Sequence, residues 1–157
     1  MEFYGLADWQ TTEQEIQQKV RLDTMPDFCE SIYYLMESQG ELCKFDTLWG
    51  QFHLRREKIN GGVRFTMPDC PNGLSLTITT GYPPEPQKVF IHCTINRLDH
   101  DPNFIETLED FVKNWVAGLE KQAGRKTQYN DDSPHKRKDE KPLKTLPMFT
   151  PEKEETV

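Results

Sequence analysis

The residues of this chain best suited to chemistry are its cysteines and histidines, which can act as nucleophiles, bases or metal ligands. The four cysteines are Cys29, Cys43, Cys70 and Cys93. They lie far apart and form no Cys-x-x-Cys pair, so a zinc site would need histidine ligands at non-standard spacings. The candidate histidines are His53, His92 and His100. We therefore expect no metal site, and we expect the thiols to be reduced and buried.

No pairing of a nucleophile with a base stands out in the sequence. The chain contains no Gly-x-Ser-x-Gly, no phosphate-binding loop and no His-Glu-x-x-His. His92 and Cys93 are neighbours in a run that predicts a strand, and neighbouring strand residues point to opposite faces, so they form no dyad. The stretch from His100 to Asn103 fits a loop that caps a helix. We predict that the protein is not an enzyme and uses no cofactor.

Charge and aromatic content divide the chain near residue 120. Residues 1–120 carry a net charge of −9 and residues 121–157 one of +2, and all three tryptophans lie in the first part. This predicts a folded domain followed by a disordered tail. The acidic domain disfavours nucleic acid as a partner. With no signal peptide and no apolar run long enough to span a membrane, the expected location is the cytoplasm or the nucleus.

Hydrophobic periodicity predicts helices before and after the strands in the sequence. Thr12 and Glu15 form a capping-box pattern that begins a first helix. A second helix is expected from about residue 24 to Gly40, since its apolar residues follow helical spacing. The last helix starts with Asp101 or Asn103 as its cap and ends at Gly124. Its apolar stripe is Phe104, Ile105, Leu108, Phe111, Val112, Trp115, Val116 and Leu119.

Between these helices the period changes to two, which indicates strands. Alternation begins at Trp49, and Asn60-Gly61 predicts a tight hairpin. Further strands are expected at residues 63–67, 74–79 and 89–95, the last two separated by a proline-rich connection. The sequence therefore predicts an α+β fold with N-terminal helices, a four-stranded antiparallel meander and a C-terminal amphipathic helix. The predicted parts are a helical extension (1–23), an α+β domain (24–120) and the tail (121–157).

Two short motifs resemble the RWD domains, which are relatives of the ubiquitin-conjugating enzymes. Cys29-Glu30-Ser31-Ile32-Tyr33 is similar to the Leu-Glu-Ser-Ile-Tyr run at the start of RWD domains. Tyr82-Pro83 is similar to the start of the family's Tyr-Pro-x-x-x-Pro-Pro element, although Gln87 and Lys88 replace its closing prolines. The resemblance implies a two-layer domain that binds other proteins. No cysteine follows His100-Asp101-Pro102-Asn103, where a conjugating enzyme would carry its nucleophile, so the implied role is non-catalytic.

Candidate binding residues follow from these elements. Trp49, Gln51 and His53 are expected on the polar face of the sheet, where a tryptophan would mark an interface; a register shifted by one residue would instead place Trp49 in the core. Tyr82 is a further interface candidate. In the tail, Ser133 and Thr150 match the sites of proline-directed kinases, and residues 143–149 form a small apolar island.

These features lead to one main functional prediction and two alternatives. The main prediction is a non-catalytic adaptor or scaffold subunit whose partner is another protein, such as an RWD-like or ubiquitin-pathway protein, with no nucleic acid or membrane bound by the folded domain. The first alternative is an inactive relative of the ubiquitin-conjugating enzymes that binds ubiquitin-like proteins. The second alternative is a small enzyme or a ligand-binding α+β protein.

Overall fold

The computed structural model describes residues 1–81, 83–96 and 99–131. The chain divides into two compact units, Met1–Ala123 and Gly124–Val157, and the first of these carries the features below. The elements are β1 (Glu2–Ala7), α1 (Glu13–Lys19), the 3-10 helix η1 (Leu22–Thr24), α2 (Met25–Phe28), β2 (Ile32–Gln39), β3 (Leu42–Thr47), β4 (Gly50–Ile59), β5 (Gly62–Thr66), β6 (Ser75–Thr80), β7 (Val89–Thr94) and α3 (Pro102–Asp131).

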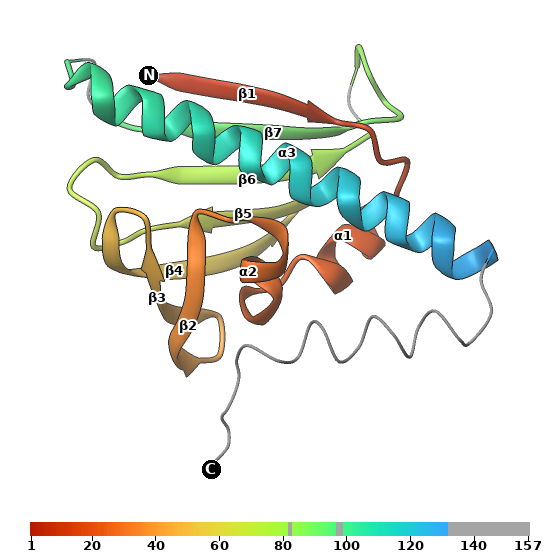
Figure 1. The fold of residues 1–157 in the computed structure, drawn as a ribbon, viewed down its shortest axis with the longest axis horizontal. Helices are drawn as coiled ribbons and strands as arrows, with labels where there is room; N and C mark the ends of the chain where they lie inside the picture. The colour runs from red at the N-terminus through yellow and green to blue at the C-terminus, as the bar shows by residue number, and fades with distance from the viewer. Residues whose placement is uncertain (82, 97–98, 132–157) are drawn as a thin grey trace. The chain divides into compact units, whose positions relative to one another are not determined.

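Within the described residues, seven strands form one antiparallel sheet in the order β1-β7-β6-β5-β4-β3-β2. Strands β2 to β7 follow one another as a meander, because short turns bring consecutive strands together in antiparallel pairs. The first strand of the chain then pairs with the last, so β1 lies at one edge and β2 at the other. Figure 1 shows α3 crossing one face of this sheet, which we call the inner face; the opposite face is the outer face.

The general class predicted from the sequence, α+β with a C-terminal helix on an antiparallel sheet, is confirmed, but the four-stranded meander is wrong. The additional strands are β1, β2 and β3. Strand β1 lies in the part of the chain that was predicted to be a helical extension. Its residues pair along their whole length with β7, from Glu2 opposite Thr94 to Ala7 opposite Val89.

The predicted helix from residue 24 to Gly40 is also wrong. Only Met25–Phe28 is helical, and Ile32–Gln39 forms the edge strand β2. The run Ile32-Tyr33-Tyr34 is β-branched and aromatic, and such residues prefer strands. Apolar residues in a short run can fit both the helical period and the strand period, so the helical spacing does not distinguish the two structures here.

The first helix and the central hairpin are confirmed. The Thr12 side chain accepts a hydrogen bond from the Glu15 backbone N–H at 3.1 Å, which caps α1. Gly61 has φ of 90° in the tight turn between β4 and β5, a conformation that glycine adopts without strain. The turn residues Asn60-Gly61 therefore join two paired strands as the sequence predicts.

Helix α3 begins as expected but continues past its predicted end. Asp101 Oδ1 accepts the Asn103 N–H at 2.8 Å at the start of the helix, and the helix runs through Gly124 to Asp131. A glycine inside a helix weakens it but does not always end it. Among the described residues, no helix combines the length and apolarity that crossing a membrane requires.

The space between α3 and the inner face is filled by aromatic side chains. Trp115 is fully buried, and its ring stacks with Phe28 and with Phe65, each with a centroid separation of 6.1 Å. Phe45 and Phe111 are also fully buried. This aromatic core holds the helix on the sheet and leaves the outer face free to carry a site.

Candidate binding pocket on the outer face

Side chains on the central strands alternate between the aromatic core and the outer face. On β6, Leu76 and Ile78 are buried under α3, while Ser75 and Thr77 point to the outer face and are half-buried. This alternation was predicted from the sequence and is confirmed. Because partners in an antiparallel sheet share a face, the strand register then determines which outer residues are neighbours.

One row of partners on the outer face forms the floor of a pocket. Across five adjacent strands, from the β1 edge to β4, the row is Leu6, Phe90, Thr79, Gly62 and Ile59. Gly62 has no side chain, so the row has a gap between Ile59 and Thr79. A Cβ at Gly62 would lie 2.0 Å from the Ile78 carbonyl oxygen, so the close approach of β5 to β6 requires glycine here.

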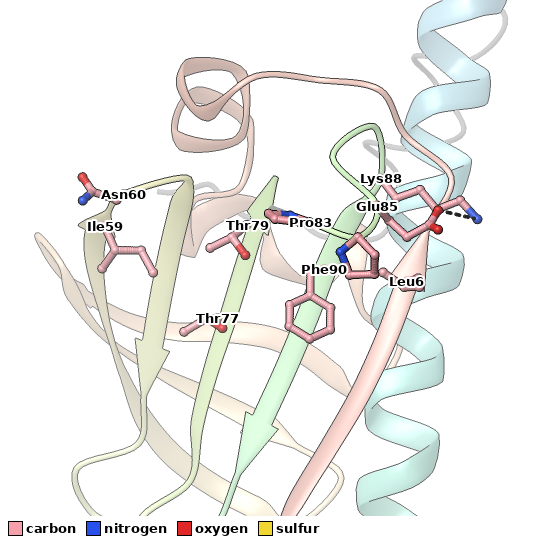
Figure 2. Close-up of a pocket in the computed structure, with 10 residues that line it drawn as sticks. Leu6, Ile59, Asn60, Thr77, Thr79, Pro83, Glu85, Lys88 and Phe90 are labelled. Atoms are coloured by element: carbon pink, nitrogen blue, oxygen red, sulfur yellow. Dashed lines mark ion pairs between the residues drawn. The ribbon is translucent and has the colours of Figure 1, made fainter. Parts of the chain in front are cut away.

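The connection from β6 to β7 forms the wall above this row. The resulting pocket has a volume of about 470 Å³, and Figure 2 shows its residues on one side of the sheet. It is lined by Leu6, Ile59, Asn60, Thr77, Thr79, Pro83, Pro84, Glu85, Lys88 and Phe90. Five of these ten residues are aliphatic, prolyl or aromatic, and sites for small molecules likewise combine apolar walls with a few polar groups.

The polar groups of the pocket lie on its floor and at its rim. The hydroxyls of Thr77 and Thr79 have no hydrogen-bond partner among the described residues, although Thr79 is only 6% exposed. At the rim, Lys88 Nζ lies 3.4 Å from Asp8 Oδ1 and 3.7 Å from Glu85 Oε1. The floor therefore offers unused hydroxyl groups, and the rim offers charges that are already paired.

The Phe90 side of the pocket is held by stacked rings. Tyr4 stacks on Phe90 with a centroid separation of 5.4 Å and on His92 with one of 4.7 Å. The Tyr4 hydroxyl donates to Glu2, whose carboxylate also lies 2.8 Å from His92 Nε2. Stacking of this kind fixes ring orientation, so the aromatic wall has a defined shape before any ligand arrives.

The opposite side is held by helix α1. Gln17 Nε2 donates to the carbonyls of Ile59 at 3.2 Å and Gly62 at 3.1 Å, and Glu13 Oε2 accepts the Gly61 N–H at 2.8 Å. These bonds fix the hairpin turn that carries Ile59 and Asn60 into the pocket. Both sides of the pocket are thus positioned by residues outside it, which lowers the ordering cost of binding.

The residues predicted to bind a partner lie elsewhere. Gln51 and His53 are on the outer face of β4, as expected, but they do not line the pocket. His53 contacts Asp69, with its Nδ1 2.8 Å from Asp69 Oδ2. Tyr82, Ser133 and Thr150 lie outside the described residues, so their predicted roles stay predictions.

Trp49 lies on the inner side, and its predicted position on the polar face is wrong. It precedes β4, its ring centroid is 5.1 Å from that of Phe111, and its Nε1 donates to Thr107 Oγ1 at 2.9 Å. The turn between β3 and β4 is followed by Gly50, the first residue of β4, which has φ of 115°, and this local geometry directs the indole under α3. The alternative assignment of Trp49 to the core is the one that the structure supports.

Replacing Trp49 by alanine should therefore lower stability by about 2–4 kcal/mol, because the substitution removes ring contacts with α3 and the bond to Thr107. Trp49→Phe, which keeps a ring but loses the N–H, should lose less than half of that. Urea unfolding of both variants measures the difference. An alanine variant as stable as the parent would contradict the placement of Trp49 under α3.

Two of the cysteines, Cys29 and Cys93, offer little reactivity. Burial raises the pKa of the Cys93 thiol to about 12, and burial likewise raises that of Cys29 to about 12. A thiol with so high a pKa is almost entirely protonated near neutral pH, and the protonated form is a poor nucleophile. Cys93 also points to the inner face, away from the pocket. The described residues contain no cluster of three or more potential metal ligands.

Some pocket residues could not be identified from the sequence. Leu6 belongs to a strand that the sequence does not predict. Lys88 and Glu85 belong to a connection in which only Tyr82 is predicted to bind a partner. One local signal is available, because the series Ser75, Thr77 and Thr79 predicts the polar face of a strand. Its neighbours depend on strand register, which brings together residues more than 80 positions apart.

Comparisons by sequence find neither a matching family model nor a matching curated protein. Comparisons by structure find similar folds. The protein XoxI from Bacillus cereus is 12% identical, with a TM-score of 0.58, over 78% of this chain and 94% of that one. A START superfamily protein from Mycobacterium smegmatis is 9% identical, with a TM-score of 0.54, over 79% of this chain and 97% of that one.

A putative uncharacterized protein from Bacillus thuringiensis is also similar, at 12% identity and a TM-score of 0.52, over 76% of this chain and 98% of that one. These likenesses overturn the RWD resemblance, which depended on two short motifs. They also overturn the predicted role as an RWD-type adaptor or scaffold, since that role was inferred from the resemblance. The seven-stranded antiparallel sheet with its long C-terminal helix is similar to the fold of this START superfamily protein.

Proposed function

We propose that this protein binds a small, mainly apolar molecule in the pocket on the outer face. The observation that carries the proposal is the apolar lining of this pocket, which is formed by Leu6, Ile59, Phe90, Pro83 and Pro84. The pocket volume of about 470 Å³ lies within the usual range for small-molecule sites, roughly 300–1,000 Å³. Transfer of apolar ligand surface from water into such a pocket is favourable.

The polar groups suit orientation of a ligand better than chemistry on it. Thr77 and Thr79 can each donate or accept one hydrogen bond on the floor. Lys88 and Glu85 are partly exposed and paired with opposite charges, so neither resembles a desolvated catalytic group. We therefore propose binding without covalent chemistry. This function develops the alternative of a ligand-binding α+β protein, and the fold likeness to a START superfamily protein agrees with it.

Titration with the neutral fluorescent probe N-phenyl-1-naphthylamine tests the proposal. We expect saturable binding to one site, with an increase in fluorescence as the probe leaves water. Thr77→Trp should weaken binding at least about tenfold, because it adds roughly 100 Å³ or more of side chain to a pocket of limited volume. Thr77 faces outward and is half-buried, so this variant should fold.

Ser75→Trp is the matched control. Ser75 lies on the same strand and the same face, but it does not line the pocket. It should bind the probe as the parent does. If Thr77→Trp and Ser75→Trp bind the probe equally, the pocket is not the binding site. The predicted cytoplasmic or nuclear location and the absence of nucleic-acid and membrane binding stay predictions.

A further inference from the structure

The charges at the pocket rim are unequal in number. Lys88 is the single cationic side chain among the described residues that line the pocket. It faces two carboxylates, Asp8 at 3.4 Å and Glu85 at 3.7 Å. Figure 2 marks its ion pair with Glu85 at the upper side of the pocket. The rim therefore carries a net charge of about −1 when all three groups are ionised.

This arrangement has different consequences for ligands of different charge. A ligand anion can reach the Lys88 ammonium only by displacing a carboxylate or by standing beside two of them. Asp8 and Lys88 belong to β1's C-terminal flank and to the connection before β7, so their pairing also links the two segments that border the pocket. An uncharged ligand leaves this cluster intact.

The floor supports the same selection. Thr77 and Thr79 provide neutral hydroxyls, and the remaining lining close to them is Phe90, Ile59 and Leu6. An anionic group placed there would lose its hydration without gaining a cationic partner, which is unfavourable. A hydroxyl, amine or carbonyl group of an uncharged ligand can instead bond to a threonine hydroxyl.

We propose that the pocket discriminates against anionic ligands, such as free carboxylates and sulfonates, in favour of uncharged ones, through the Asp8–Lys88–Glu85 cluster. This inference rests on the proposed function, because it assigns a ligand class to the same pocket. It adds a role for Asp8 and Glu85, which are specificity residues that an apolar pocket alone does not require.

Two probes that share one ring system test the selection. N-phenyl-1-naphthylamine is uncharged at neutral pH, and 8-anilinonaphthalene-1-sulfonate adds a sulfonate to the same rings. We expect the uncharged probe to bind about five- to tenfold more tightly, as expected for one opposing charge near a protein surface at low salt. For each probe, binding in the pocket is the part of the fluorescence increase that is lost in the Thr77→Trp variant.

The double variant Asp8→Asn, Glu85→Gln leaves Lys88 without its two carboxylates. Its affinity for the sulfonate should rise about fivefold or more, while its affinity for the neutral probe should stay within about twofold. The control is Glu37→Gln, Glu109→Gln, which removes the same charge at exposed positions outside the pocket. That control should leave the ratio between the two probes unchanged.

The outcomes separate the two proposals. If the sulfonate binds the parent protein as tightly as the neutral probe, the charge selection is overturned and ligand binding stands. If both double variants change the ratio equally, long-range charge and not the rim cluster is responsible, which also overturns the inference. If the neutral probe does not bind the parent protein, the proposed function itself fails.

Discussion

Gly118→Ala should destabilise the protein by about 3 kcal/mol or more, a large fraction of the stability of a small domain. A Cβ at position 118 would lie 1.7 Å from the Phe28 carbonyl oxygen and 2.5 Å from its carbonyl carbon. Both are backbone atoms, so no side-chain rotation relieves the overlap. Helix α3 would have to move away from α2, which would open the aromatic core around Trp115.

Gly124→Ala in the same helix is the matched control. A Cβ there would have no neighbour within 4 Å, so the substitution should be neutral or should stabilise the helix by up to about 1 kcal/mol. Urea denaturation followed by circular dichroism measures both variants. A Gly118→Ala variant as stable as Gly124→Ala would show that α3 does not pack closely on the backbone at Phe28.

Trp115→Ala should have an effect of similar size, about 3–5 kcal/mol, because it leaves a large cavity between Phe28 and Phe65. Trp115→Phe should cost much less, for two reasons. It preserves a ring between its neighbours, and it removes an indole N–H that is buried without a hydrogen-bond partner among the described residues. A buried donor without a partner is itself unfavourable.

Thermal unfolding of the two Trp115 variants gives the comparison. The alanine variant should melt at least about 10 °C below the phenylalanine variant, if unfolding is two-state. Equal melting temperatures would mean that the ring stack around Trp115 contributes little. Both variants keep the outer face unchanged, so any folded fraction should still bind the neutral probe.

The elements that the sequence predicted correctly are those with strong local signals. The stripe from Phe104 to Leu119 is long enough to average over exceptions, and Asn60-Gly61 meets the φ requirement of a tight turn. The Thr12 cap is also local, since donor and acceptor are three residues apart. Each of these signals is local, because it depends on residues that are close in the sequence and lie within one element or turn.

The elements that were missed depend on distant partners. Met1 to Ala7 has few features of its own, and it is a strand because β7 provides its hydrogen-bond partners. Residues 32–39 contain both helical spacing and strand-forming residues, and pairing with β3 decides between them. The alternation of β4 does not extend to Trp49, because this residue precedes the first residue of the strand. Continuing the alternation to Trp49 therefore places its side chain on the wrong face of the sheet.

The pocket also depends on residues that are distant in the sequence. Its floor joins residues from five strands, and the sequence gives no sign that Gly62 stands beside Thr79 or that Leu6 stands beside Phe90. The proline-rich connection is correctly separated from the strands, but Tyr82 is the only residue in it that the sequence predicts to bind a partner. Prolines and glycines in the sequence indicate where the chain turns. They do not indicate which residues of other strands the turn contacts.

The pairing of β1 with β7 also has a consequence for the order in which the strands can pair during folding. The Met1 amine donates to the Ile95 carbonyl, a contact across 94 positions, whereas the hairpins from β2 to β7 close over short loops. Long-range closure is slower and has a larger entropic cost than local pairing. On a ribosome, the first seven residues must wait unpaired until most of the domain has been made. Because Leu6 and Asp8 lie in this late-pairing segment, we expect the meander to form before the pocket is complete.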